Sequence, residues 1–303
     1  MQTPKPSLIQ QIPFKNKGNI ELYIKREDLI HPFISGNKFR KLKYNIVEVQ
    51  AEKHQTVLTF GGAYSNHIAA TAYACKISGL KSIGVIRGEE LRDEINENPT
   101  LSFAQSCGME FLFVTRTDYR KKTESEFIEN LKKKFGDFYM IPEGGTNTLA
   151  VKGCEEILNN DDARYDFVCT CVGTGGTISG LINTSSAEQK ILGFTALKGD
   201  FLNQDIRKFA TNSNWDLLTD YHFGGYAKIK PELIAFINAF KADYGIPLDP
   251  IYTGKMMFGI IDLIKKGYFL SNTKILAIHT GGLQGISGIN LRLKQQNKPL
   301  IKV

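Results

Sequence analysis

The sequence lacks the long apolar runs that membrane-spanning helices need. No stretch of its 303 residues approaches the ~20 consecutive apolar residues of such a helix. The first residues, Met1–Pro6, also lack the apolar core of a signal peptide. We therefore expect a chain that stays in the cytoplasm and has no membrane partner.

Cysteine is scarce, and its spacing suits neither a metal site nor a disulfide framework. The chain has five cysteines, an odd number, and no C-x-x-C pair. The cysteines are Cys75, Cys107, Cys154, Cys169 and Cys171. We expect buried, reduced thiols and no bound metal.

Positive charge is in modest excess. Lys and Arg number 38 against 31 Asp and Glu, so the net charge is +7. Such a balance would suit a nucleic acid, an anionic membrane or acidic small molecules. The basic residues form short, separate groups, and no helix-turn-helix, zinc-finger or RRM signature accompanies them. We therefore expect solvent-facing lysines and no nucleic-acid partner. Two of the groups, Arg120–Lys122 and Lys132–Lys134, are predicted to lie on the exposed faces of one helix.

Strand-like and helical patterns alternate along the chain. Predicted strands are Thr56–Phe60, Ser82–Ile86, Glu110–Val114, Phe167–Val172 and Lys274–His279. Predicted helices are Asn37–Gln50, Asn66–Ser78, Thr100–Cys107, Ser125–Phe135, Thr146–Leu158, Thr177–Thr184, Pro231–Tyr244, Lys255–Lys266 and Gln284–Lys294. Because the strands are almost continuously apolar, the alternation predicts an α/β protein with mostly parallel sheets flanked by helices. The turn-rich segment Pro142–Asn147 is a candidate junction between two lobes.

Four glycine-rich segments are predicted where a strand ends and a helix begins. They are Gly61–His67, Gly173–Gly180, Tyr252–Lys255 and His279–Gly282. Open α/β sheets bind ligands at such places, because helix N-termini present free N–H groups. The second segment is not a Walker A loop, and Ile178 stands where a Rossmann fingerprint needs glycine. What remains is either a phosphate cradle or a tight strand-to-helix turn.

One lysine stands at an unusual place. We expect Asn37 to cap a helix whose first turn contains Lys38, although cations prefer the other end of a helix. That position and partial burial would both depress the pKa of Lys38, as an amine nucleophile for a carbonyl cofactor requires. The alternative is an exposed lysine beside Arg40, Lys41 and Lys43.

The ordered motifs resemble one enzyme family over almost the whole chain, from Thr3 to Gly282. They are Lys25–Asp28, Ser35–Leu42, Gly61–Gly62, Ser65–His67, Pro142–Asn147, Gly173–Thr177, Gly224–Tyr226, Asp249–Lys255 and His279–Gly282. Together they resemble pyridoxal-phosphate enzymes of the tryptophan-synthase-β type. The closest resemblance is to the 1-aminocyclopropane-1-carboxylate deaminase and D-cysteine desulfhydrase family.

The resemblance implies a role for each matching residue. Lys38 would hold the cofactor, pyridoxal 5'-phosphate, as a Schiff base and remove the α-proton. The other cofactor-binding residues would be Asn66, at the 3'-oxygen, with Gly173, Thr174, Gly175, Gly176 and Thr177 at the phosphate, and Tyr252, Thr253 and Thr280 at the ring. Ser65, Asn66, His67 and Tyr226 would bind the substrate, and Ser65, Tyr226 and Tyr252 would assist Lys38 in catalysis.

Two positions distinguish the deaminases from the desulfhydrases of this family, and this chain has threonine at both. The deaminases have Tyr-Glu-Gly-Lys and His-Leu-Gly-Gly where this chain has Thr253 and Thr280. A hydroxyl cannot give the pyridine nitrogen a full counter-charge, and a weaker electron sink suits elimination of a good leaving group. The resemblance therefore implies a lyase that acts on a small amino acid, D-cysteine. The alternatives are 1-aminocyclopropane-1-carboxylate deamination, another β-substituted amino acid, and a non-catalytic anion- or nucleotide-binding protein.

The resemblance also implies an architecture, that of fold type II pyridoxal-phosphate enzymes. Two α/β lobes would enclose the cofactor in a cleft. Residues 1–41 and 149–303 would form a large cofactor-binding domain and residues 42–148 a small domain, in a homodimer.

Overall fold

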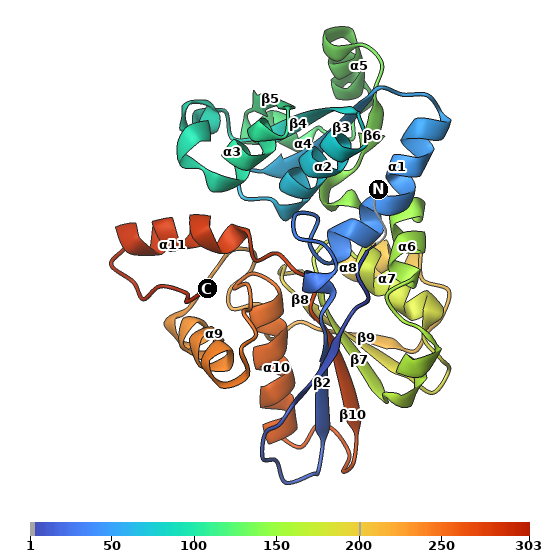
Figure 1. Cartoon of the computed structure of the whole chain (residues 1–303), viewed down its shortest axis with the longest axis vertical. Helices are drawn as coiled ribbons and strands as arrows, with labels where there is room; N and C mark the ends of the chain where they lie inside the picture. Colours follow the sequence, from blue (N-terminus) through green and yellow to red (C-terminus); the bar gives the residue numbers. More distant parts are fainter. Residues whose placement is uncertain (1–3, 200) are drawn as a thin grey trace.

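Two β-sheets organise the chain (Figure 1). The computed structural model describes residues 4–199 and 201–303. One sheet has six strands in the order β1-β2-β10-β7-β8-β9, and only β1 is antiparallel to its neighbour. The other has four parallel strands in the order β5-β4-β3-β6. The strands are β1 (Ile9–Ile12), β2 (Glu21–Lys25), β3 (Thr56–Gly62), β4 (Lys81–Arg87), β5 (Met109–Val114), β6 (Tyr139–Ile141), β7 (Phe167–Val172), β8 (Lys190–Thr195), β9 (Trp215–Leu218) and β10 (Lys274–Ile278).

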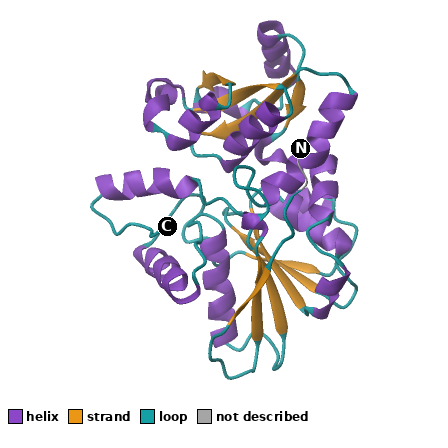
Figure 2. Ribbon diagram, viewed as in Figure 1, coloured by secondary structure: helices purple, strands orange, loops and turns teal. Residues whose placement is uncertain are grey.

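Helices cover both faces of each sheet (Figure 2). They are α1 (Asn37–Ala51), α2 (Asn66–Ile77), α3 (Pro99–Ser106), α4 (Arg116–Arg120), α5 (Ser125–Phe135), α6 (Thr148–Glu155), α7 (Gly176–Thr184), α8 (Phe201–Arg207), α9 (Pro231–Tyr244), α10 (Thr253–Lys265) and α11 (Gly285–Gln295). The predicted fold class, α/β with mostly parallel sheets, is confirmed. Among the residues described, no helix combines the length and hydropathy that crossing a bilayer needs.

The predicted strands and helices are all present, and their ends differ by no more than three residues. The sequence patterns missed β1, β2, β6, β8, β9, α4 and α8. Most of these elements are too short to show a period, and β8 is interrupted by Gly193. Pairing with neighbouring strands, which no local pattern reveals, stabilises the five missed strands.

Two predictions about local structure are wrong. The basic groups at 120–122 and 132–134 do not share a helix, because α4 ends at Arg120 and α5 begins at Ser125. A short turn between the two helices separates the groups. The segment Tyr252–Lys255 does begin a helix, α10, but it follows α9 and a loop rather than a strand.

The alternation of side chains along β7 places a hydrophobic core on each face of the larger sheet. Cys169 and Cys171 point into the core formed with α9, α10 and α11. Val168 and Val172 point into the core formed with α6, α7 and α8. The five cysteines are all buried and free, as expected.

Not all basic residues face solvent, contrary to the prediction. Lys25, Arg26, Arg40, Lys41 and Lys255 are buried. Most of them have carboxylate partners: Lys25 pairs with Asp162, Arg26 with Asp28, and Arg40 with Glu27. A buried charge needs a partner of opposite charge because the loss of its hydration costs free energy. Lys41 and Lys255 form no ion pair with the described residues, and both lie near the site.

Helix α1 connects the two sheets. Its apolar face packs in the same core as α2 and β3 of the smaller sheet, and it also packs against α6. The domain boundary expected between residues 41 and 42 falls within this helix. The smaller sheet is built from residues 56–141 and the larger one from both ends of the chain. A division into two domains at those residues remains a prediction.

Candidate active site

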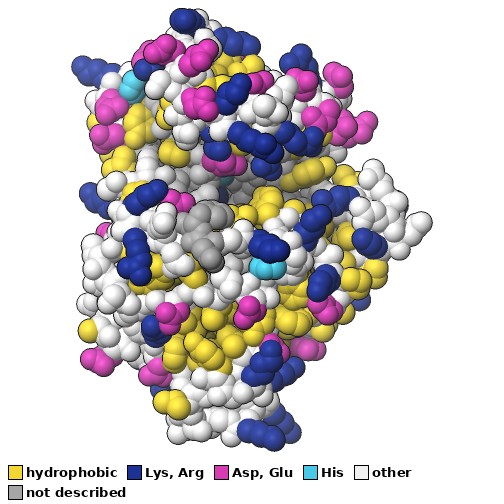
Figure 3. All heavy atoms as spheres, turned by 180° about the vertical axis from the view of Figure 1, so that it is seen from behind, with side chains coloured by type: hydrophobic (Ala, Val, Ile, Leu, Met, Phe, Trp, Pro, Cys, Tyr) yellow, Lys and Arg dark blue, Asp and Glu magenta, His cyan; other side chains and the backbone are white. Residues whose placement is uncertain are grey.

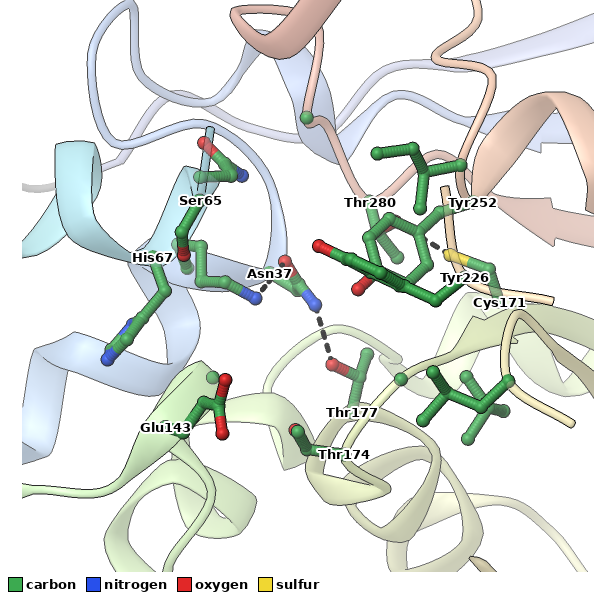
Figure 4. Close-up of a pocket in the computed structure, with 18 of the residues that line it drawn as sticks. Asn37, Ser65, His67, Glu143, Cys171, Thr174, Thr177, Tyr226, Tyr252 and Thr280 are labelled. Carbon is green, nitrogen blue, oxygen red and sulfur yellow. Dashed lines mark hydrogen bonds between the residues drawn. The ribbon is translucent and has the colours of Figure 1, made fainter. Parts of the chain in front are cut away.

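A cavity of about 540 Å³ lies between the two sheets (Figure 4). Its walls come from α1, from the loops after β3, β7 and β10, and from the segment before α10. The predicted site residues that line it are Lys38, Ser65, Asn66, His67, Gly173, Thr174, Gly175, Thr177, Tyr226, Tyr252 and Thr280. Gly176 and Thr253 do not line it. The fold thus gathers residues from six separate parts of the sequence.

The start of α1 is fixed against the loop after β10. Gly36 is the N-cap, with a φ of +61°, and a Cβ there would lie 2.0 Å from the carbonyl oxygen of Thr280. Only glycine permits this close approach. The prediction that Asn37 caps the helix is wrong, because its side-chain amide instead donates to Thr177 Oγ1 over 2.8 Å. This bond ties α1 to the start of α7.

Lys38 lies in the first turn of α1, as predicted, and its amine lines the cavity. Its Nζ lies 3.4 Å from the side-chain oxygen of Asn37. Burial lowers the pKa of Lys38, the direction expected from the sequence. No carboxylate of the described residues lies within 4.0 Å of Lys38, so no close carboxylate charge raises this pKa again. An amine in this setting is neutral more often than an exposed lysine.

Lys41 is a site residue that the sequence patterns missed. Its Nζ donates to the carbonyl of Gly144 over 3.0 Å, to Thr146 Oγ1 over 2.8 Å and to Thr174 Oγ1 over 3.3 Å. Burial and the neighbouring charge of Lys38 lower the pKa of Lys41 to about 7. The three-residue spacing from Lys38, which places both on one face of α1, was the available signal.

The loop from Gly173 to Thr177 forms an anion cradle. It joins β7 to α7, and Gly175 turns the chain in the left-handed region, with a φ of +83°. No side chain caps α7, so its first N–H groups are open to a ligand. The positive end of the helix dipole and the Lys41 ammonium both favour a phosphate there.

Two tyrosines form an aromatic wall of the cavity. The rings of Tyr226 and Tyr252 lie 6.3 Å apart at 62° to one another. A Cβ at Gly173 would come within 3.2 Å of the Tyr252 ring, so glycine lets the cradle pack against it. Burial raises the pKa of both phenols, which keeps them neutral hydroxyl groups.

The two threonines that divide the family have different surroundings. Thr280 lines the cavity, and its Oγ1 lies 3.0 Å from Cys171 Sγ. Thr253 is fully buried and donates its hydroxyl to Asp249 Oδ2 over 2.6 Å. The expected contact of Thr253 with a bound ring is therefore not supported by this arrangement. Asp249 itself lines the cavity and was not singled out from the sequence.

The side chains of the three polar residues after β3, Ser65, Asn66 and His67, also have different surroundings. Ser65 is the N-cap of α2 and accepts the Ile68 N–H over 3.4 Å, and Asn66 begins the helix. His67 is buried, and its Nε2 lies 2.8 Å from Thr59 Oγ1. Burial and two nearby lysines lower its pKa well below the ordinary value. A neutral imidazole carries no charge to attract an anion, and the part of His67 in substrate binding remains a prediction.

The site fits pyridoxal phosphate. The cradle at α7 and Lys41 suit the phosphate, the amine of Lys38 suits the aldehyde, and the Tyr252 ring offers an apolar face. Asn66, Ser65 and the open start of α2 remain for the other polar groups of the cofactor and for a substrate carboxylate.

Comparison with known proteins agrees with this geometry. A family model described as pyridoxal-phosphate dependent enzyme matches residues 3–281. A putative 1-aminocyclopropane-1-carboxylate deaminase of Pyrococcus horikoshii is 33% identical, over 93% of this chain and 91% of that protein. A mitochondrial bifunctional D-cysteine desulfhydrase/1-aminocyclopropane-1-carboxylate deaminase of Arabidopsis thaliana is 31% identical, over 88% of this chain and 73% of that protein. A solved structure of an ACC deaminase homologue superposes with a TM-score of 0.83 at 29% identity, over 97% of this chain and 94% of that chain.

Proposed function

Because the chain belongs to the pyridoxal-phosphate-dependent enzyme family, we propose that it is a lyase that converts D-cysteine to pyruvate, ammonia and sulfide. The observation that carries this choice is the hydroxyl of Thr280 on the cavity wall, beside the thiol of Cys171. Asp249, a carboxylate of the cavity wall, accepts N–H groups from Ile251 to Thr253 and the Thr253 hydroxyl. Its oxygens are therefore occupied.

The cofactor and the protein divide the chemistry. When bound, pyridoxal phosphate supplies the electron sink that stabilises negative charge at the α-carbon. Gly173–Thr177 and Lys41 would hold its phosphate, Asn66 would meet its 3'-oxygen, and the ring of Tyr252 would pack against its face. A hydroxyl such as that of Thr280 leaves the sink weak, which suits the departure of a thiolate.

Lys38 would remove the proton from the α-carbon of the substrate. Its lowered pKa leaves the Nζ able to accept the proton from the α-carbon. The Cβ–S bond then breaks, and its electron pair leaves with sulfur. Ser65 and the N–H groups at the start of α2 would orient the substrate carboxylate, because an anion is favoured at a helix N-terminus. Tyr226 would cover the substrate side of the cavity.

A second candidate is deamination of 1-aminocyclopropane-1-carboxylate to 2-oxobutyrate. The names of several relatives favour it, and one relative is named for both activities. Opening an unactivated carbon ring needs a stronger sink than a threonine hydroxyl provides. The non-catalytic alternative is not supported, because the chain belongs to an enzyme family.

The test is a direct comparison of substrates on cofactor-loaded protein. We expect sulfide and pyruvate from D-cysteine at a kcat/KM above that for release of 2-oxobutyrate from 1-aminocyclopropane-1-carboxylate. Lys38→Ala is expected to lower kcat by roughly 10²–10⁴-fold and to abolish the visible absorbance of the bound cofactor. Lys43→Ala, on the same helix but paired with Glu156 outside the cavity, serves as the control. Loaded protein that releases neither sulfide nor pyruvate would contradict the proposal.

We further propose that the enzyme acts in the cytoplasm as a homodimer with the two domains expected from the sequence. Five free, buried thiols are compatible with a reducing compartment. The stacked aromatic rings of Phe33, Tyr73 and Phe103, with Phe33 about half exposed, offer a surface for a second copy. Sedimentation of the loaded protein as a monomer at micromolar concentration would contradict the dimer.

A further inference from the structure

The mouth of the cavity contains positive charge that the proposed reaction does not use. We propose that Arg87 and Lys122 form a subsite for a second anionic group, so that the enzyme also takes amino acids whose side chain ends in a carboxylate or sulfonate. This inference rests on the proposed function, because it assumes that the α-amino acid binds beside Lys38. It extends the substrate class beyond D-cysteine.

Arg87 reaches toward the cavity from the last position of β4. Its partner in the neighbouring strand is Gly62, at the end of β3. A Cβ at Gly62 would lie 3.5 Å from a guanidinium nitrogen of Arg87, so this side chain lies over the bare backbone of Gly62. Both residues line the cavity, and Gly62 leads directly into the loop that ends at Ser65. Arg87 therefore stands next to the place assigned to the substrate.

Arg87 lacks a partner of opposite charge. Among residues 4–199 and 201–303, no carboxylate lies within 4.0 Å of its guanidinium. The guanidinium instead lies 5.6 Å from the centre of the Tyr119 ring, and Lys122 Nζ lies 5.0 Å from the same ring. Glu143 faces Lys122 at 3.3 Å. Of the two cations beside the Tyr119 ring, only Lys122 has a carboxylate partner, which leaves a net positive charge at this wall.

The charge of Arg87 acts on the substrate side of the cavity. Burial raises the pKa of Tyr226, the positive charge of Arg87 opposes that rise, and the negative charges of Glu143 and Asp249 add to it to a smaller extent. Tyr226 also lines the cavity, so the two side chains face a common space. Figure 3 shows Lys and Arg side chains gathered on the edge of the smaller-sheet lobe above a hollow in the surface.

The two other anionic groups of the proposed reaction, the cofactor phosphate and the substrate α-carboxylate, are already assigned to binding positions. The cofactor phosphate is assigned to the start of α7 with Lys41, and the α-carboxylate to the start of α2. The fork of N–H donors on an arginine matches a planar carboxylate or a sulfonate, and a concave site focuses its field. The free donors of Arg87 are therefore available to a third anionic group, on the side chain of the substrate.

The test compares ligands that differ in one charge. D-cysteate and D-aspartate carry a side-chain anion, whereas D-alanine and D-serine do not. Each is titrated into the loaded enzyme, and binding is followed by the change in the visible absorbance of the cofactor. We expect the two anionic ligands to bind at least tenfold more tightly than D-alanine, with an advantage that falls as salt is added. Arg87→Gln should reduce that advantage at least tenfold, Arg87→Lys less and Lys122→Gln in part.

Arg120→Gln is the matched control, since it removes an exposed arginine of the same lobe that does not line the cavity. An equal loss of affinity for D-alanine and D-cysteate in Arg87→Gln would overturn the inference, because Arg87 would then hold the α-carboxylate. No preference of the wild type for the anionic ligands would also overturn it. If D-cysteine gives no sulfide while D-cysteate binding still depends on Arg87, the proposed reaction fails and the subsite stands.

Discussion

At the scale of single residues, two lysines three positions apart divide the work of the site. Both Lys38 and Lys41 lie on one face of α1, and burial lowers the pKa of each. Within the described part of the chain, Lys38 has only the oxygen of Asn37 within hydrogen-bond distance, whereas Lys41 donates to three oxygen atoms around the cradle. Hydrogen bonds fix the position of Lys41, while the Lys38 amine remains available for chemistry.

The lowered pKa of Lys41 predicts how the stability of the cofactor-free protein depends on pH. Its pKa falls from 10.5 in the unfolded chain to about 7 in the folded one. Between these values the unfolded state binds more protons, so the free energy of unfolding rises with pH. The slope contributed is at most about 1.4 kcal/mol per pH unit. Urea unfolding at pH 7, 8 and 9 should show this slope, and Lys41→Met should flatten it.

Lys43→Met is the control for this experiment, because Lys43 pairs with Glu156 outside the cavity. It should leave the slope as in the wild type. A slope that Lys41→Met does not change would show that Lys41 keeps its proton in the folded protein at these pH values.

At the scale of elements, helix α10 holds the segment that carries Tyr226. Lys255, in its first turn, donates to the carbonyls of His222 and Gly225 over 2.9 Å each. Phe223 and Ala227 both have a φ of +55°, a conformation that non-glycine residues adopt at a cost. The buried ammonium therefore stabilises a strained loop, and through it the position of the Tyr226 ring.

Lys255→Met is expected to loosen this loop. It leaves two carbonyls without their donor, which costs about 1–3 kcal/mol for each group that stays buried and unsatisfied. We expect KM for D-cysteine to rise several-fold, with little change in cofactor affinity, since the lost hydrogen bonds hold the loop of Tyr226, which is assigned to the substrate side. Steady-state kinetics and cofactor titration measure the two effects. Lys265→Met, at the exposed end of the same helix, should change neither value. A parallel loss of cofactor binding in Lys255→Met would contradict this role.

At the scale of the whole molecule, a stack of three helices sets the distance between Lys38 and the phosphate cradle. Helix α6 packs between α1, which carries Lys38, and α7, which begins at the cradle. Glycines allow the contact on both sides. A Cβ at Gly153 would lie 1.9 Å from the carbonyl oxygen of Arg40, and one at Gly180 would lie 2.6 Å from the Cβ of Cys154.

Gly153→Ala is expected to push α1 and α6 apart. Overpacking of this kind costs about 1–3 kcal/mol, and here the obstacle is backbone that cannot rotate away. The shift separates Lys38 from Gly173–Thr177, so cofactor affinity should fall together with the melting temperature. Thermal unfolding and cofactor titration test this. Lys152→Ala, one position earlier on the exposed side of α6, is the control. Unchanged cofactor affinity in a destabilised Gly153→Ala protein would show that the stack does not set this distance.

The sequence by itself determined the long elements and the motifs that follow them. Apolar strands such as β7 and capped helices such as α2 are local patterns, because periodicity and a capping serine act over a few residues. The glycine-rich loop after β7 and the lysine at the start of α1 were visible for the same reason. The local patterns predicted the fold class, and the family resemblance of the ordered motifs implied the cofactor.

Only the tertiary structure decided which side chains meet. Thr253 and Thr280 look alike in the sequence, yet one bonds to buried Asp249 and the other faces the cavity. Lys41 was expected to be a surface charge and Arg87 was not singled out, and both enter the site because α1 crosses to the cradle and β4 ends beside Gly62. Such contacts join residues far apart in the chain. Their energies depend on burial and on partners that exist only once the two sheets have packed.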